Sequence, residues 1–256
     1  MDKLIHTALN SLHSARIRQN VSSQNLSNAQ VPGFRGDEIG GRFGSIFLES
    51  DSTLSTRVFT KRSEAGLFSD LQGELRQTDE QNDVAIVGEG YFLIEGKSGE
   101  LAMSRRGDLT IGLDKTLRNG ADEVMLDTSL TPITMPQFKK LFVSENGQIY
   151  IQPVGAADGT RVLVNQIAMT SGQDIQLAKD TDGAIRPMGD FVREQFNPDQ
   201  NVRLKQGYLE TSNVSVFDEL INNVEIQKQY QLNVKLISLA KELDEAGSAL
   251  MRLPNN

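Results

Sequence analysis

The sequence lacks residue types on which many catalytic and metal sites depend. It contains no Cys, no Trp and only two His, at positions 6 and 13. Without Cys, disulfides, thiolate metal sites and thiol nucleophiles are excluded. His6 and His13 are seven residues apart, whereas a metal-binding pair on a helix needs the one-turn spacing of i and i+4. We therefore expect a protein that is not an enzyme, with no catalytic residue, metal or cofactor.

Basic residues and long apolar runs are also scarce. The net charge is −8, whereas a protein that binds nucleic acid needs a surplus of Lys and Arg to neutralise phosphates. No apolar run approaches the roughly 20 residues of a membrane span. The opening segment, MDKLIHTALNSLHSARIRQN, lacks the uninterrupted apolar core of a cleavable signal peptide. We expect neither nucleic acid binding nor membrane insertion, and we expect any export to use another route.

A strong helical pattern is present at the C-terminal end, over residues 214–253. Apolar side chains follow one another there in alternating steps of four and three residues, which places them on one helix face. The helix is expected to begin at Ser215, with Asp218 and Glu219 suited to the positive end of its dipole. This apolar stripe has to be buried against the N-terminal segment or against other chains. Its members are Leu232, Leu236, Leu239, Leu243, Ala246, Leu250 and Leu253.

A second helix is predicted at the N-terminal end, from about Asp2 to a break at Pro32–Gly33. Small residues on it let a partner helix approach closely, namely Ala8, Ser11 and Ala15. The C-terminal stripe also allows a plainer interpretation, in which it closes only an intramolecular helix pair, but that interpretation leaves the small residues of the N-terminal helix unexplained. The apolar residues of the N-terminal helix are Ile5, Leu9, Leu12, Ile17, Val21 and Leu26.

The middle of the chain is predicted to consist of strands. Residues 84–87 and 91–95 are apolar runs separated by glycines, and we expect them to form a strand pair. Residues 141–143 and 149–151 flank Asn146–Gly147, which is typical of a hairpin turn. Because no helical pattern lies between these runs, an antiparallel sheet or small barrel is expected. The charged run Arg105–Asp108 is interpreted as a solvated turn.

These patterns predict an α+β fold in which discontinuous, coiled-coil-like terminal helices flank a mainly antiparallel β domain. We expect residues 1–34 and 212–256 to form a helical assembly domain. Residues 35–81, which are rich in Gly, Ser and Thr, would be an extended linker with short strands, and residues 82–211 the central β domain. Two adhesive terminal helices favour assembly over catalysis. The alternative is a soluble protein whose β domain binds a small ligand and whose helices merely dimerise.

Four segments resemble motifs of the flagellar axial proteins, the family of rod, hook and hook-associated proteins. Asn25–Asn28 followed by Val31–Arg35 resembles "NNLAN…TxGFK", and Asp83–Phe92 resembles "DVAIxGxGFF". Met103–Thr110 resembles "YTRxGxFxxD", and Gln206–Val214 resembles "QGxLExSNV". The four motifs occur in the family's order and extend from one end of the chain to the other.

The resemblance implies a structural subunit of the bacterial flagellar basal-body rod, which polymerises through its terminal helices and transmits torque. The opening MDKLIHTALNS and the short length resemble proximal rod members, with a distal rod or hook-type subunit as the alternative. The implied partners are other rod subunits, further copies of the chain, and the flagellar type III export apparatus; no small-molecule substrate is implied. The implied location is the periplasm-spanning rod, reached without a cleaved signal peptide.

We expect three groups of residues to carry assembly and interaction. Gly33 is expected to adopt a backbone conformation that other residues resist, and Phe34 to anchor the corner near Val214 and Phe217. The N-terminal group is Leu9, Leu12, Asn25, Leu26, Asn28, Gly33 and Phe34. The group before the last helix is Gly207, Asn213 and Val214. The group on the last helix is Leu232, Leu236, Leu239, Leu243 and Leu250.

Overall fold

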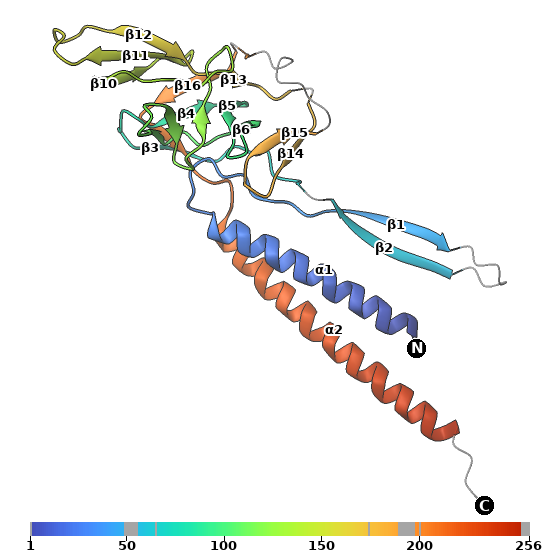
Figure 1. Ribbon diagram of the computed structural model, residues 1–256. Coiled ribbons are helices and arrows are strands. Elements are labelled where there is room, and N and C mark those ends of the chain that lie inside the picture. The colour runs from blue at the N-terminus through green and yellow to red at the C-terminus, as the bar shows by residue number, and fades with distance from the viewer. Residues whose placement is uncertain are drawn as a thin grey trace, which may run out of the picture. The chain divides into compact units, whose positions relative to one another are not determined.

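The computed structural model describes residues 2–48, 56–64, 66–173, 175–188, 198–199 and 201–251. The chain forms two compact units, and Figure 1 labels most of their elements. The first, here called the helical unit, comprises Met1–Ser27, Asp37–Ala65 and Ser215–Asn256. The second, here called the β unit, comprises Asn28–Gly36 and Gly66–Val214. Residues 37–65, from the linker expected between helix and β domain, therefore group with the helices.

The helical unit contains two long helices, α1 (Asp2–Ser27) and α2 (Val216–Met251). They run antiparallel, because Asn223 bonds to Ser22 near the start of α2 and Asn233 bonds to Ser11 farther along. Figure 1 shows α2 continuing past the N-terminal end of α1. As predicted, Ser215 caps α2: its Oγ accepts the Asp218 backbone N–H at 3.3 Å.

Small side chains bring α1 and α2 together. Ala8 and Ala15 of α1 are buried, and so are Ile226 and Ala240 of α2. The side chain of each alanine is only a methyl group, so the helix backbones can approach closely. The small residues on the N-terminal helix were predicted to have this role, and the burial of Ala8 and Ala15 confirms it.

A long two-stranded hairpin also belongs to the helical unit. Strands β1 (Gly40–Leu48) and β2 (Thr56–Glu64) pair antiparallel, from Gly40 opposite Glu64 to Leu48 opposite Thr56. The sequence indicated only short strands in this stretch, because its glycines and weak periodicity gave no clear pattern.

Antiparallel sheets make up the β unit. The largest has the order β14-β15-β6-β5-β9-β8-β7, with β13 also pairing with β5. Its strands are β5 (Tyr91–Glu95), β6 (Leu101–Ser104), β7 (Leu109–Ile111), β8 (Leu117–Asn119), β9 (Val124–Met125), β13 (Met169–Thr170), β14 (Leu177–Lys179) and β15 (Ile185–Pro187).

The smaller sheets complete this unit. A three-stranded sheet has the order β10-β11-β12, and the pairs β16-β4 and β17-β3 are separate ribbons. Every strand pair in the described residues is antiparallel, as predicted. The strands are β3 (Leu75–Gln77), β4 (Val84–Val87), β10 (Phe138–Val143), β11 (Gln148–Pro153), β12 (Val162–Gln166), β16 (Arg203–Gln206) and β17 (Tyr208–Glu210).

The two predicted strand pairs have different outcomes. The hairpin around Gly147 is confirmed, since Leu141 pairs with Ile151 and Val143 with Ile149. The pairing of residues 84–87 with 91–95 is wrong: β4 pairs with β16, and β5 pairs with β6, β9 and β13. Both runs are almost fully buried, so each needs partners that a local glycine turn does not supply.

One continuous hydrophobic core joins the sheets of the β unit. Its buried side chains come from strands of the large sheet, of the three-stranded sheet and of the β16-β4 ribbon. Because this core is internal to the β unit, it does not depend on the apolar residues of the helices. Members with little or no exposure include Val84, Ile86, Phe92, Ile94, Leu117, Met125, Ile133, Leu141 and Ile149.

Candidate assembly surfaces and the buried helix connectors

The predicted apolar stripe of α2 lies at the protein surface. Leu232, Leu236, Leu239 and Leu243 are each 45–63% exposed, and the side chain of Leu250 is outside the described residues. The face that α1 covers lies one residue farther along α2, at Asn233, Ile237 and Ala240, which are half-buried or buried. The interpretation in which the stripe merely closes the intramolecular helix pair is therefore wrong.

The start of α2 is equally rich in exposed apolar side chains. Soluble proteins rarely leave a contiguous apolar patch of this kind uncovered unless it is an interaction site. On α1, Leu9 is exposed, whereas Leu12 and Leu26 are half-buried. The exposed residues at the start of α2 are Val216, Phe217, Leu220, Ile221 and Val224.

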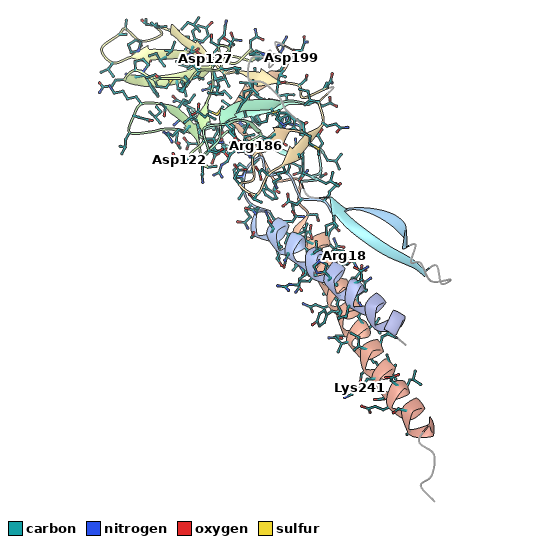
Figure 2. The ribbon with its side chains drawn as sticks, turned by 45° about the vertical axis from the view of Figure 1, so that its right-hand side comes forward. Arg18, Asp122, Asp127, Arg186, Asp199 and Lys241 are labelled. Carbon is teal, nitrogen blue, oxygen red and sulfur yellow. The ribbon has the colours of Figure 1, made fainter. Side chains whose placement is uncertain are left out.

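Hydrogen bonds fix how the two helices pair. The Glu219 carboxylate accepts hydrogen bonds from Ser22 Oγ at 2.5 Å and from Asn25 Nδ2 at 2.8 Å. Farther along, Arg18 donates to Gln229 Oε1 at 2.6 Å (Figure 2 labels Arg18 on α1). Such bonds are satisfied in only one register, so they set the register while the small residues set the distance.

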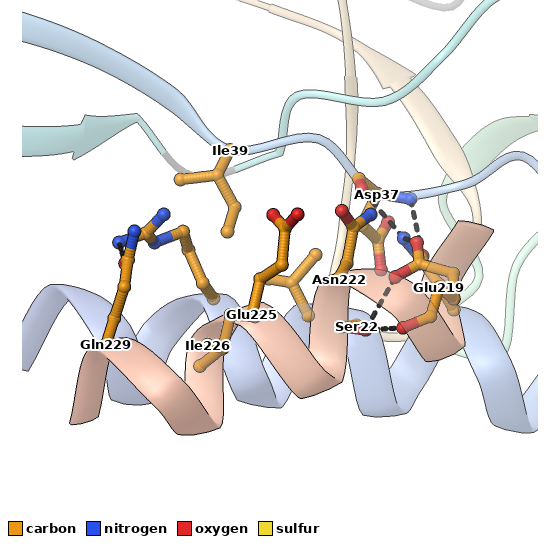
Figure 3. A pocket seen from close by; sticks show the side chains of 11 residues that line it. Ser22, Asp37, Ile39, Glu219, Asn222, Glu225, Ile226 and Gln229 are labelled. Atoms are coloured by element: carbon orange, nitrogen blue, oxygen red, sulfur yellow. Dashed lines mark hydrogen bonds between the residues drawn. The ribbon is translucent and has the colours of Figure 1, made fainter. Parts of the chain in front are cut away.

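Asn25 also holds the chain that follows the helix. Its Oδ1 accepts the Asp37 N–H at 2.8 Å, and its Nδ2 donates to the Asp37 carbonyl at 3.0 Å. Beside these bonds lies a hollow of about 240 Å³, which is lined by α1, by α2 and by Asp37 and Ile39 (Figure 3). The predicted site residue Asn25 is thus a structural link within the helical unit.

Three of the four resembling motifs meet at a buried ion cluster in the β unit. The cluster consists of Arg35, Arg105 and Glu210, whose side chains are only 1–3% exposed. Arg35 Nη2 lies 3.1 Å from Glu210 Oε1, and Arg105 Nε lies 2.9 Å from Glu210 Oε2. The Gly73 N–H also donates to Glu210 Oε1, at 3.0 Å. A single carboxylate therefore pairs with two guanidiniums.

Backbone carbonyls accept further hydrogen bonds from both guanidiniums. Arg105 donates to Gly90 O and Gly88 O, both at 2.7 Å, and Arg35 donates to Leu71 O. Burial lowers the pKa of Arg105, and the neighbouring Glu210 opposes that shift. Such carbonyl bonds stabilise charges that would otherwise be too costly to bury.

The interpretation of Arg105–Asp108 as a solvated turn is wrong for its first residue. Arg105 is 2% exposed, whereas Arg106 forms a half-exposed ion pair with Asp108. Other ion pairs of the β unit lie nearer the surface, such as those of Asp122 and Arg186, which Figure 2 labels. The sequence signal for Arg105 was its place inside a family motif, and its charge concealed its burial.

Two members of the ion cluster, Arg35 and Glu210, belong to the segments that connect the β unit to the helices. We call residues 28–36 the N-terminal connector and residues 210–214 the C-terminal connector. The Gly33 N–H donates to Glu210 O at 2.8 Å, and the Asn213 N–H donates to Phe34 O at 3.3 Å. The Gly36 N–H donates to Asn213 Oδ1 at 2.7 Å. The two connectors are therefore hydrogen-bonded to each other.

Gly33 has the conformation expected of it. Its φ is +65°, and a Cβ there would lie 2.4 Å from the Arg105 carbonyl carbon and oxygen. Only glycine satisfies both conditions.

Gly207 also has a positive φ, of +77°. Asn28, Asn213 and Val214 are half-buried, and Asn213 Nδ2 donates to the carbonyls of Ser69 and Leu71.

The partner of Phe34 is a residue that the sequence did not indicate. Lys179 Nζ lies 3.7 Å from the centre of the Phe34 ring and donates to Arg35 O at 2.7 Å. Lys179 itself is buried, so a cation over the aromatic ring is well placed to stabilise the corner. Phe217, expected beside Phe34, is 72% exposed.

Among the described residues, no group of three His, Asp or Glu could hold a metal ion. In the same part of the chain, neither helix has the length and apolar character needed to cross a membrane. The distinctive features are the exposed stripe on α2 and the buried ion cluster between the connectors.

Comparison with known proteins gives matches from one end of the chain to the other. The family described as "Flagellar basal body rod FlgEFG protein C-terminal" matches residues 205–250. The flagellar basal-body rod protein FlgF of Salmonella typhimurium is 23% identical, over 99% of this chain and 100% of the relative. FlgF of Escherichia coli is 24% identical, over 97% of each chain. FlgG of Buchnera aphidicola subsp. Schizaphis graminum is 28% identical, over 91% of this chain and 93% of the relative.

These matches confirm the resemblance seen in the four motifs. They include the C-terminal connector and most of α2, where the family match lies. Over nearly its whole length, the chain is similar to flagellar basal-body rod proteins named FlgF and FlgG.

Proposed function

We propose that this protein is a structural subunit of the bacterial flagellar basal-body rod, in its proximal part, and that it transmits torque. Polymerisation occurs through the terminal helices. The observation that carries this proposal is the exposed stripe Leu232–Leu243, which stays uncovered although α2 already has α1 as a partner. A helix of a neighbouring subunit buries this stripe in a coiled-coil-like contact. Similarity to proteins named FlgG keeps a distal rod subunit as the second candidate.

The remaining parts of the proposal follow from the family. The partners are other rod subunits, further copies of the chain, and the flagellar type III export apparatus. The protein has no catalytic role, and it reaches the periplasm-spanning rod without a cleaved signal peptide. The assembly residues proposed are those of the α2 stripe, Leu9 and Leu12 on α1, and the residues that shape the connectors.

The test places a charge in the stripe. Leu239→Asp and Leu243→Asp should each abolish rod incorporation and swimming when the variant is produced in place of the natural protein. In the assembled rod, the contact would bury an unpaired charge, which costs several kcal/mol. Both positions are exposed in the free chain, so folding should be unchanged by circular dichroism. Ser238→Asp is the matched control, since Ser238 is exposed and lies off the stripe. Normal motility of both Leu variants would refute assembly through this stripe.

A further inference from the structure

Glu210 is the only acidic partner of Arg35 and Arg105 among the ion pairs of the described residues. We propose that Glu210 is a positioning residue: it locks the N-terminal connector to the C-terminal connector within the β unit. The lock is specific to these two connectors. Its link to rod assembly rests on the proposed function, whereas the lock itself does not.

Loss of the Glu210 carboxylate should affect the N-terminal connector more than the strands around Arg105. Without its carboxylate, Arg105 keeps two carbonyl acceptors, Gly88 O and Gly90 O. Arg35 keeps one, Leu71 O. Arg35 belongs to the N-terminal connector, and a buried guanidinium with too few acceptors moves toward water. Loss of the carboxylate should therefore release the connector rather than the strands around Arg105.

A second set of bonds makes the two connectors behave as one element. Three backbone N–H groups join them, those of Gly33, Gly36 and Asn213, and their acceptors are Glu210 O, Asn213 Oδ1 and Phe34 O. Each of these bonds requires the chain to keep the position that the Arg35–Glu210 ion pair sets. Movement of Arg35 should thus expose all three N–H groups to solvent together.

Amide hydrogen exchange of the full-length protein, measured by mass spectrometry, tests the lock. Glu210→Gln should speed exchange of the Gly33, Gly36 and Asn213 amides by roughly tenfold or more, while β5 amides exchange as in the natural protein. Arg35→Met should speed exchange of the same connector amides while leaving the Arg105–Glu210 pair in place. If Glu210→Gln fails to fold, Arg35→Met therefore tests the lock by itself. Asp114→Asn, which breaks an exposed ion pair with Arg118, is the control and should change neither region.

Two outcomes would overturn the proposal. Connector amides that stay as protected as in the natural protein would show that the cluster does not hold them. Equal acceleration in the connectors and in β5 would show that the cluster is simply part of the core. Neither result bears on the α2 stripe, whose variants test rod assembly separately. If the lock exists, Arg35→Met should also lower rod incorporation relative to Asp114→Asn.

Discussion

At the scale of single residues, Gly33 shows how a motif position can be dictated by two independent constraints. It needs a positive φ, which costs an L-residue about 1–2 kcal/mol, and it has no room for a Cβ beside the Arg105 backbone. A glycine after a proline at a helix end already indicated the first constraint. The second could not be predicted, because Arg105 is distant in the sequence.

Substitution of Gly33 separates the two constraints. Gly33→Ala should lower the unfolding free energy of the β unit by about 3 kcal/mol or more, since it adds a clash with main-chain atoms to the cost of positive φ. Gly99→Ala is the matched control: its φ is +79°, and a Cβ there would meet nothing within 4 Å. Urea denaturation measures both. Equal losses would show that the Arg105 backbone moves aside easily.

The buried charges mark the limit of prediction at this scale. Arg105 and Lys179 are chemically indistinguishable in sequence from the exposed cations around them. Their burial depends on Glu210 for one and on Phe34 and the Arg35 carbonyl for the other. These partners come together only in the complete β unit, so no local sequence pattern predicts them. Membership of Arg105 and Glu210 in family motifs was the usable signal.

At the scale of elements, both long helices were predictable, but the face that joins them was not. The heptad of leucines is the strongest pattern in α2, yet α1 packs one residue away from it, against Ile226, Asn233 and Ala240. Small side chains and hydrogen bonds to Ser11 and Ser22 determine the contact. Hydrophobic periodicity alone therefore selects the wrong face of α2 as the contact with α1. The apolar stripe remains exposed and is available to another partner.

Overpacking the helix contact tests this account. Ala15→Leu should destabilise the α1–α2 pair by about 1–3 kcal/mol, because Ala15 is buried and the added atoms force the helices apart. Gln19→Leu is the control, since position 19 is on the exposed surface of the same helix. Thermal unfolding followed by circular dichroism reports the helical signal. If Ala15→Leu melts like Gln19→Leu, the close contact at Ala15 does not form in solution.

At the scale of the whole molecule, the division between helices and strands followed from the sequence, whereas the ends of the β unit did not. A start at residue 82 seemed natural because the apolar strands begin there. However, β3, Asp70, Leu71 and Gly73 all precede it, and each bonds to the later part of the unit. These segments are polar or short, so neither hydrophobicity nor periodicity marks them as part of a core.

Two fragments distinguish these boundaries. Residues 28–214 contain the whole β unit with both connectors and should unfold cooperatively in urea. Residues 82–211, the domain expected from the sequence, lack Arg35 and the β3 partner of β17. Removal of one member of a buried ion pair costs about 3–5 kcal/mol. The shorter fragment should therefore lose at least about 3 kcal/mol of stability, or unfold without a cooperative transition. Equal midpoints and slopes for the two fragments would show instead that the core alone holds the unit, and that the connectors only attach to it.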